Sequence, residues 1–517
     1  MIIRDIMENS RNAYSDMAAV KWLVKKQIHE KTYGEMMNET EQIRRGLFAS
    51  GFGGKHIAIT GKSSVDWIES YLAIMTGNMV AVPLDVTLPA EDLIDLIDRS
   101  DSEGVFCLND QKLIEAIKEA CPKVRNIWLL DEKENKKTEI PDGGEGITIS
   151  PLSELIRKGT AEEADAPAAG PDDVATIIFT SGTTGKSKGV MLTQKNIAEN
   201  VLSVHYEAAP GTRMLSVLPI HHAFCLVMDW LKGFSLGAEL CINDSLLHLV
   251  RNMSVFNPDV ILMVPMMIET IYKRLSAADA SIPKEILAKK IFGENLRIIF
   301  TGGAHLEPFY IDEFAEYGIA VLEGYGMSEC SPVISMNAPE DHKDGSIGRP
   351  LENVEIRFEN DEILVRGSSV MQGYYQMPAE TEETLKDGWL HTGDKGYMDE
   401  DGFLFINGRV KNLIILSNGE NVSPEEIENK LALSPLVGEV IVTGEGTGLT
   451  ARIYPEQALA EEMDEETVRE ELQKILDEYN RKQPTYRHIT GLTVRKHPFI
   501  RSATKKILRR MADVDED

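Results

Sequence analysis

The sequence predicts an α/β protein with a large N-terminal domain of mostly parallel sheets flanked by helices, a β-hairpin subdomain, and a small, mobile C-terminal α+β domain. Three observations lead to this prediction. The chain has 517 residues, more than one hydrophobic core usually holds. Short apolar stretches in its middle part alternate with loops or helices, which is typical of a parallel sheet covered on both faces. Near residue 361 the pattern changes to short hairpins.

The middle part begins after a polar stretch at 158–173, rich in Ala, Pro and acidic residues, which is predicted to be a loop. Pro265 suits the first turn of a helix predicted at 266–275. The apolar stretches are predicted to be strands at 174–180, 214–218, 260–264, 296–300 and 320–323.

The last part of the chain has the pattern of a separate small domain. Stretches at 362–366 and 403–406 predict hairpin strands, and the residues from Ser423 form a capping box with proline at the first helical position. A further helix is predicted at 465–481. We therefore expect domains at 1–408 and 412–517, with a hinge at 409–411.

Composition excludes some classes of partner. The formal charge of −29 argues against nucleic acid or an anionic membrane surface as a standing partner, since both need a broad basic face. Five scattered cysteines without metal-ligand spacing favour reduced thiols. The N-terminus does not resemble a signal peptide, and the longest apolar run, 260–268, is too short to cross a bilayer. A cytoplasmic protein without a transmembrane segment is the expectation.

The most informative segment is 178–189, which reads IFTSGTTGKSKG and is expected to follow a buried strand and precede a helix. Three glycines allow backbone N–H groups to point at one anion, and hydroxyls and lysines add donors and positive charge. A P-loop would need glycine at position 180, where the chain has Thr180. The segment therefore predicts another kind of polyphosphate site. Its expected contacts are Thr180, Ser181, Gly182, Thr183, Thr184, Gly185, Lys186 and Lys188.

This segment resembles the signature of the adenylate-forming superfamily, which includes acyl-CoA synthetases, firefly luciferases and peptide-synthetase adenylation domains. Four later blocks are similar to those of the family in the same order: EGYGMSE at 323–329, WLHTGD at 389–394, NGRVK at 407–411 and SATKKILR at 502–509. The resemblance covers roughly residues 30 to 510, and the chain looks most like the fatty-acid–CoA ligase branch.

The resemblance implies a role for each block. Lys506 is expected to bridge the acyl carboxylate and the α-phosphate, where two anions must approach each other. Glu329 is expected to hold Mg²⁺, Asp394 to accept from the ribose hydroxyls with Arg409 nearby, and Lys411 to be the pivot of the C-terminal domain. The remaining residues expected around the nucleotide and the acyl carbonyl are Gly302, Gly303, Ala304, Glu323, Gly324, Tyr325, Gly326 and Ser328.

The predicted acid site centres on His222, which occupies the place of the family's acyl-site histidine. The Asp of aminoacyl-activating relatives is missing there, which favours a plain carboxylic acid. His221 replaces an aromatic residue usual at its place, so a core histidine is the alternative for it. The methionines Met263, Met266 and Met267 could line an acyl tunnel or belong to the ordinary core.

Three departures from the family pattern leave the reacting groups in place: Ser187 stands for a common Pro, Asn407 for Asp, and Lys505 for the Gly before the catalytic lysine. The Lys505-Lys506 doublet leaves a one-residue ambiguity, which the following Ile-Leu-Arg resolves in favour of Lys506.

The reaction that the resemblance implies uses ATP and Mg²⁺ to convert a carboxylic acid, expected to be a medium- or long-chain fatty acid, to acyl-AMP. The acyl group then passes to coenzyme A. Three alternatives are an acyl carrier protein as acceptor, a nucleotide sensor without catalysis, and a luciferase-like oxygenation. Residues 481–510 hold ten Lys or Arg and no acid. They form either an anion-binding face for coenzyme A or a surface that balances the acidic helix before it.

Overall fold

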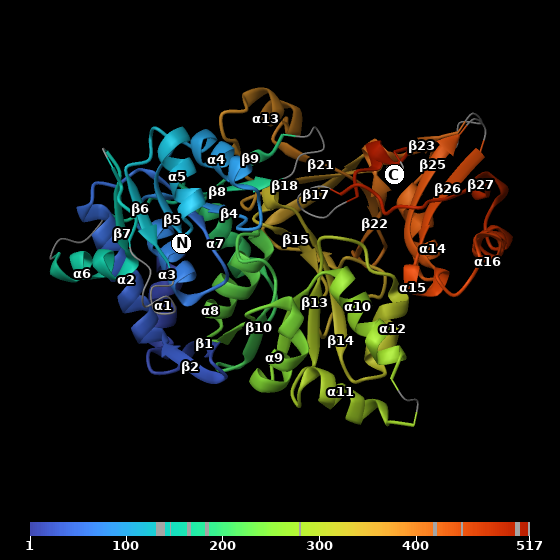
Figure 1. Cartoon of the computed structure of the whole chain (residues 1–517), viewed down its shortest axis with the longest axis horizontal. Helices are drawn as coiled ribbons and strands as arrows, with labels where there is room; N and C mark the ends of the chain where they lie inside the picture. The colour runs from blue at the N-terminus through green and yellow to red at the C-terminus, as the bar shows by residue number, and fades with distance from the viewer. Residues whose placement is uncertain are drawn as a thin grey trace. The chain divides into compact units, whose positions relative to one another are not determined.

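The computed structural model describes residues 1–130, 140–144, 146–162, 167–180, 186–278, 281–416, 421–445, 448–501 and 507–514. The chain divides into two compact units (Figure 1). The first consists of Met1–Glu355 with Val365–Leu390, and the second of Ile356–Leu364 with His391–Asp517. The predicted fold class is confirmed. The expected domain boundary at 408–412 stays a prediction.

A nine-stranded sheet forms one layer of the first unit, in the order β16-β15-β14-β13-β12-β10-β11-β1-β2. Strands β14, β13, β12, β10, β11 and β1 are parallel to their neighbours in this row, whereas β2, β15 and β16 pair antiparallel. The bounds are β1 Ala18–Val24, β2 Gln27–Thr32, β10 Arg213–Ser216, β11 Glu239–Ile242, β12 Val260–Met263, β13 Ile298–Thr301, β14 Ala320–Gly326, β15 Val333–Met336 and β16 Arg349–Pro350.

An eight-stranded sheet of the first unit has the order β19-β9-β8-β4-β3-β5-β6-β7. Strand β3 carries Ile57, Ala58 and Ile59, all fully buried, as expected of a parallel strand covered on both faces. The bounds are β3 His56–Thr60, β4 Val80–Leu84, β5 Ser102–Cys107, β6 Asn126–Leu129, β7 Thr148–Pro151, β8 Val174–Thr180, β9 Lys188–Thr193 and β19 Gly373–Tyr374.

Helices pack around these sheets in Figure 1. Local signals set their ends: Ser64, for example, accepts a hydrogen bond from the Trp67 N–H (3.2 Å) and so caps α3. The helices of the first unit are α1 Ile3–Tyr14, α2 Tyr33–Ala49, α3 Val65–Met75, α4 Ala90–Arg99, α5 Gln111–Ala120, α6 Leu152–Ala161, α7 Gln194–Ser203, the π-helix η1 Cys225–Lys232, α8 Gly233–Ser235, the 3-10 helix η2 Leu246–His248, α9 Leu249–Phe256, α10 Pro265–Ser276, α11 Lys284–Phe292, α12 Pro308–Ala315, the 3-10 helix η3 Ser328–Cys330 and α13 Pro378–Thr384.

The second unit has its own hydrophobic core, in which Ile427 of α14, Ile453 of β26 and Leu472 of α16 are fully buried. Its three-stranded sheet is β25 Val437–Glu445, β26 Gly448–Pro455 and β27 Ile489–Val494. Further elements are the 3-10 helix η4 Val410–Asn412, β23 Ile414–Ile415, β24 Asn421–Val422, α14 Pro424–Ala432, α15 Gln457–Ala460, α16 Glu465–Arg481 and the 3-10 helices η5 Thr485–Arg487 and η6 Arg509–Met511. A five-stranded sheet comprises β17 Val354–Glu359, β18 Glu362–Gly367, β20 Leu385–Lys386, β21 Trp389–Met398 and β22 Leu404–Arg409.

Three local predictions were wrong. The segment at 178–189 is followed by strand β9, antiparallel to β8, and helix α7 begins only at Gln194. The predicted loop at 158–173 begins inside α6, which continues to Ala161. Helix α14 does begin at Pro424, but the Ser423 hydroxyl donates to the Glu425 carboxylate (3.1 Å) and does not cap the helix.

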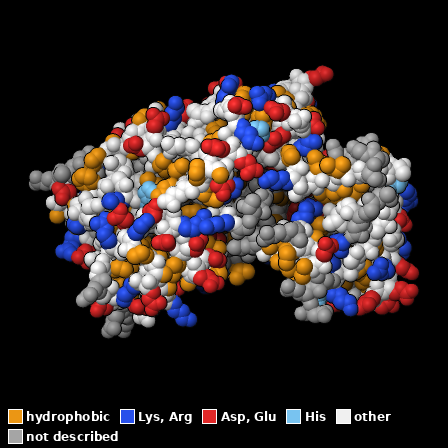
Figure 2. Space-filling view, turned by 90° about the horizontal axis from the view of Figure 1, so that it is seen from above, with side chains coloured by type: hydrophobic (Ala, Val, Ile, Leu, Met, Phe, Trp, Pro, Cys, Tyr) orange, Lys and Arg blue, Asp and Glu red, His pale blue; other side chains and the backbone are white. Residues whose placement is uncertain are grey.

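The next feature is the distribution of charged side chains on the surface. On the face shown in Figure 2, basic side chains are interspersed with acidic ones and do not gather in one broad patch. All five cysteines are free and buried. Within the described ranges, no helix combines the length and apolar character that a membrane crossing requires.

Candidate active site

The candidate site residues of the first unit follow the carboxyl ends of parallel strands. Because β10, β12, β13 and β14 are parallel, the segments after them leave the sheet at one edge, which is where α/β sheets bind ligands. The predicted residues at this edge are His222 after β10, Gly302, Gly303 and Ala304 after β13, and Glu323, Gly324, Tyr325, Gly326, Ser328 and Glu329 in β14 and just after it. The topology therefore brings these parts of the prediction together.

Two neighbouring strands approach closely at the glycine turn after β13. A Cβ atom at Gly302 would lie 2.9 Å from the Gly324 carbonyl oxygen, so only glycine fits there without a shift. Glu323, one residue before that carbonyl, is paired with Thr301 and is buried. Burial raises the pKa of the Glu323 carboxyl to about 7, although His305 and the backbone at Leu306 oppose the rise. This carboxyl is therefore partly protonated near neutral pH.

Glu329 is held by a residue that sequence reasoning missed. It lies buried in the 3-10 helix η3, and the Tyr374 hydroxyl donates a hydrogen bond to its Oε1 (2.8 Å). The Lys188 ammonium lies 4.7 Å from the centroid of the Tyr374 ring. Burial, together with the Glu329 charge, raises the pKa of the Tyr374 hydroxyl, so this hydroxyl stays protonated and remains a donor. Nothing in the local sequence distinguishes Tyr374 from an ordinary strand aromatic.

The donor set around Glu329 fits Mg²⁺ bound together with a polyphosphate. Mg²⁺ in such sites is usually held by one or two carboxylates plus phosphate oxygens and water. Over the part of the chain that is described, no group of three or more His, Cys, Asp or Glu side chains could hold a metal by itself. A single carboxylate beside the phosphate segment is therefore consistent with a metal that arrives with the nucleotide.

The predicted phosphate segment lies between β8 and β9. Ser181, Gly182, Thr183, Thr184 and Gly185 fall outside the described residues, while Thr180 ends β8, Lys186 is exposed and Lys188 begins β9.

Arg99 fixes both ends of this hairpin connection. It donates to the Ser187 carbonyl (2.7 Å), and its guanidinium lies 5.6 Å from the centroid of the Phe179 ring. Arg99 is a second residue that the sequence analysis did not identify.

The two histidines after β10 lie against each other with their rings tilted by 41°. Their ring centroids lie 4.3 Å apart, and His221 Nε2 lies 3.7 Å from Oδ2 of Asp85, which follows β4 of the other sheet. Burial and the neighbouring His222 lower the pKa of His221 to about 4, against the effect of Asp85. His221 is therefore neutral at neutral pH. His222 itself is exposed at the sheet edge.

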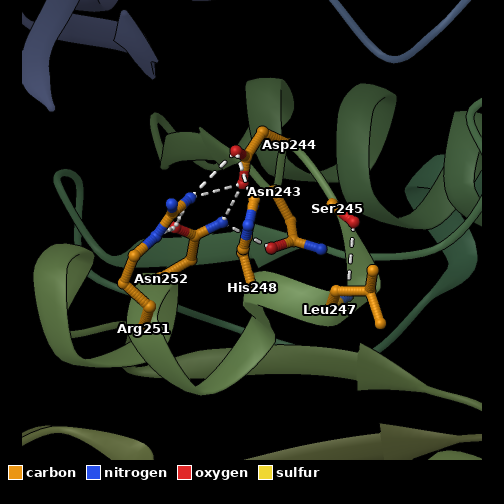
Figure 3. A network of polar contacts seen from close by, with 7 residues as sticks. All are labelled: Asn243, Asp244, Ser245, Leu247, His248, Arg251 and Asn252. Atoms are coloured by element: carbon orange, nitrogen blue, oxygen red, sulfur yellow. Dashed lines mark hydrogen bonds and ion pairs between the residues drawn. The ribbon is translucent and has the colours of Figure 1, made fainter. Parts of the chain in front are cut away.

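A polar network fixes the neighbouring loop, which follows β11 (Figure 3). Asp244 accepts hydrogen bonds from Arg251, His248 and Asn252 at 2.7–2.9 Å. These bonds outweigh the effect of burial and lower the pKa of Asp244 to about 2. The Asn243 N–H donates to the Ser216 carbonyl (3.1 Å), so this network is tied to the end of β10.

The three methionines differ in their surroundings. Met263 is fully buried in β12 and belongs to the core, whereas 58% of Met266 on α10 is exposed. Met267 is half-buried. The acyl-tunnel interpretation therefore does not apply to Met263.

The second unit holds the predicted ribose contact. Asp394 of β21 pairs in register with Arg409 of β22, and Arg409 Nε lies 2.9 Å from Asp394 Oδ1. The Asp394 side chain is nearly buried, whereas the Arg409 side chain is 54% exposed. Gly408 has φ +134°, and a Cβ there would lie 2.2 Å from the Ser423 hydroxyl, so a side chain would displace the strand beside Arg409. Lys411 is exposed in the 3-10 helix η4.

The basic C-terminal segment is used largely within its own unit. Lys505 and Lys506 lie outside the described residues. Arg509 binds the Glu428 carboxylate through both terminal nitrogens (2.7 and 2.5 Å), and Arg495 is buried and donates to three carbonyls. Four other cations also bind carboxylates or a carbonyl: Arg481, Lys482, Arg487 and Arg501. Of these six residues, only Arg481 and Lys482 bond to the acidic helix α16, and both interpretations of the basic segment stay predictions.

Comparison with known proteins supports one family over both parts of the chain. The model of the AMP-binding enzyme family matches residues 7–375, and that of the AMP-binding enzyme C-terminal domain matches 411–515. The chain is 30% identical over 485 residues to the long-chain-fatty-acid–CoA ligase 5 of Rattus norvegicus, covering 82% of this chain and 69% of that protein.

Two further proteins extend the comparison. A chloroplastic long-chain-fatty-acid–[acyl-carrier-protein] ligase, AEE15 of Arabidopsis thaliana, is 26% identical, covering 93% of this chain and 80% of that protein. The crystal structure of the anthranilate CoA ligase AuaEII with anthranoyl-AMP has a TM-score of 0.82 at 19% identity, covering 99% of this chain and 96% of that one, and so shares the fold.

Proposed function

The chain belongs to the AMP-binding enzyme family and is an AMP-forming acid–thiol ligase, and we propose that its acid is a medium- or long-chain fatty acid and its acceptor is coenzyme A. In this reaction the acid carboxylate attacks the α-phosphate of ATP, pyrophosphate leaves, and the thiol then displaces AMP from the acyl-adenylate. The proposal uses the site residues that the sequence predicts.

The observation that carries the proposal is the arrangement of Glu329, Tyr374 and Lys188. The buried Glu329 carboxylate accepts a 2.8 Å hydrogen bond from the Tyr374 hydroxyl, and the Lys188 ammonium lies 4.7 Å from the centroid of the same tyrosine ring. A carboxylate suits a hard cation, and an ammonium suits phosphate oxygens. Such a pair is what a site for a metal–polyphosphate requires.

The residues of the chain divide the work of the first half-reaction. Mg²⁺ held by Glu329 would neutralise phosphate charge when bound. Lys186 and Lys188 would orient the phosphates, and Asp394 would accept from the ribose hydroxyls, which its two oxygens allow. Lys506 would offset the repulsion between the acyl carboxylate and the α-phosphate.

Two considerations support a fatty acid. The rat relative is named for long-chain fatty acids. The predicted acid site carries His222 at the place where aminoacyl-activating relatives have Asp. The neighbouring His221 is neutral at neutral pH, so it offers no fixed charge to a second polar group of the substrate.

A carrier protein is the second candidate acceptor, and one relative favours it. AEE15 aligns with 93% of this chain and is named for delivery to a carrier protein.

Competition between acceptors tests the proposal. The purified protein is given ATP, Mg²⁺, acids of roughly C8 to C16, a range suggested by the adaptable methionines, and either coenzyme A or holo carrier protein. We expect acyl-CoA, and we expect Glu329→Gln to abolish turnover with either acceptor. Turnover with the carrier protein alone would contradict coenzyme A as acceptor and support the second candidate.

A further inference from the structure

Asp229 is a buried acid on the π-helix η1, outside every block that the proposed function uses. Its side chain is fully buried, and its Oδ2 accepts a hydrogen bond from the Ser216 hydroxyl (3.0 Å). The Cys225 thiol also points at Oδ2, at 3.6 Å. The π-helix is a rare element, and π-helical turns often occur at functional sites.

The two residues that meet at Asp229 mark the ends of one loop. Ser216 is the last residue of β10 and Cys225 is the first of η1, so the segment between them, 217–224, is the loop that carries His221 and His222. The Cys225 Sγ also lies 3.4 Å from the Ser216 hydroxyl and 3.5 Å from the Leu218 carbonyl oxygen, inside the loop. One oxygen of Asp229 therefore contacts both residues that flank the loop 217–224.

Stability does not explain an acid at this place. Among the described residues, Asp229 Oδ1 is buried and has no hydrogen-bond partner, which is costly for a carboxyl group. Burial raises the pKa of Asp229 to about 7, although Ser216 and Cys225 oppose the rise. A costly polar group that is retained in a core indicates a positional requirement.

We propose that Asp229 is a positioning residue of the acid site, which holds the loop 217–224 closed at its base and so sets where His222 stands for the acid substrate. The inference rests on the proposed function, because it assigns the acid to the His222 loop. It predicts a change in KM for the acid and not in KM for ATP, since the residues expected to contact the nucleotide follow strands other than β10.

The test measures KM for the acid and for ATP separately, by acid-dependent ATP–pyrophosphate exchange. Asp229→Ala should raise KM for the acid by about tenfold, the scale of one hydrogen bond to a carboxyl group, and leave KM for ATP within about twofold. Asp229→Asn should stay close to the wild type, because the neutral amide can still accept from Ser216. Ser216→Ala, which removes the donor at the same oxygen, should change KM for the acid in the same direction and serves if Asp229→Ala does not fold.

Val227→Ala is the matched control, because Val227 is buried in the same π-helix and has an apolar side chain. If Val227→Ala reproduces the rise in KM for the acid, or if Asp229→Ala raises both KM values equally, Asp229 is merely structural and the inference is overturned. An unchanged KM for the acid in both Asp229→Ala and Ser216→Ala overturns it as well. Absence of exchange in the wild type would instead contradict the proposed function, and the inference with it.

Discussion

The hydroxyl of Tyr374 connects Glu329 to the strand that carries the end of the phosphate segment. Tyr374 lies in β19, which pairs with β9, and Lys188 is the first residue of β9. The contact orients the carboxylate proposed to hold Mg²⁺. A side chain that orients a metal ligand affects metal affinity even when it does not touch the metal.

Removal of this hydroxyl should weaken the use of Mg²⁺. Tyr374→Phe keeps the ring below Lys188 but leaves Glu329 without its phenolic donor, so the Mg²⁺ concentration for half-maximal ATP–pyrophosphate exchange should rise by about tenfold. Tyr375→Phe is the control, because the neighbouring Tyr375 hydroxyl donates to Asp101 instead (2.6 Å). An unchanged Mg²⁺ requirement in Tyr374→Phe, or an equal rise in Tyr375→Phe, would argue against this role.

Lys506 is the residue proposed to offset the repulsion between the acyl carboxylate and the α-phosphate. Lys506→Ala should reduce acyl-AMP formation by a factor of about 10² or more, because one electrostatic donor to the transition state has that effect. The variant should still convert supplied acyl-AMP to the thioester. Lys505→Ala is the control and should adenylate normally. Near-normal adenylation by Lys506→Ala would transfer the assignment to Lys505.

Individual residues were predictable where sequence motifs name them. The structure places Arg409 beside Asp394, as the motif pattern had suggested. Tyr374 was not predictable, because it lies 45 residues from Glu329 and the two meet only in the fold, where the Met371 N–H also donates to the Glu329 carbonyl. Asp229 did carry a signal, as a lone acid in an apolar stretch, but its partners become evident only from the fold.

At the scale of elements, the local pattern predicted the long or strongly apolar segments best. Strand β8 and helix α16 have the expected bounds, and α10 begins at Pro265. Strand β9 was missed because a short apolar run after glycine could equally start a helix. Its role depends on pairing with β8 and β19, which the sequence around it does not encode.

Because Asp229 of the π-helix is a buried acid, the folding stability of the protein should depend on pH. The pKa of Asp229 is raised from 3.8 to about 7 in the folded protein, so between these values the unfolded chain loses a proton that the folded chain keeps. Folding stability therefore falls as pH rises through this range. Asp229→Asn removes the effect, so its stability relative to that of the wild type should rise from pH 5 to pH 8 by at most about 3 kcal/mol.

Urea unfolding of Asp229→Asn and of the wild type at pH 5 and at pH 8 measures this gain. Asp244→Asn is the control: the pKa of Asp244 is lowered to about 2, so its titration lies below pH 5 and its effect should be the same at both values. A constant difference between Asp229→Asn and the wild type would show that the carboxyl is charged throughout and would contradict the expected protonation.

At the scale of the whole molecule, the chain has two compact units, and the smaller one has its own hydrophobic core. We propose that Lys411, exposed in η4, is the pivot between the predicted domains 1–408 and 412–517, which take one arrangement for each half-reaction. Lys411→Pro fixes φ at about −65° and should trap one arrangement. Adenylation should persist while thioester formation from supplied acyl-AMP falls. Equal loss of both half-reactions would indicate a folding defect or a phosphate contact.

Acid-dependent ATP–pyrophosphate exchange tests the central claim most directly. The purified protein is incubated with ATP, Mg²⁺, labelled pyrophosphate and a panel of carboxylic acids, without any thiol acceptor. The account predicts label in ATP only when an acid is present, fastest with medium- or long-chain fatty acids, and none with Glu329→Gln. Exchange that is absent with every acid, although ATP binds, would contradict acid activation as the function of this protein.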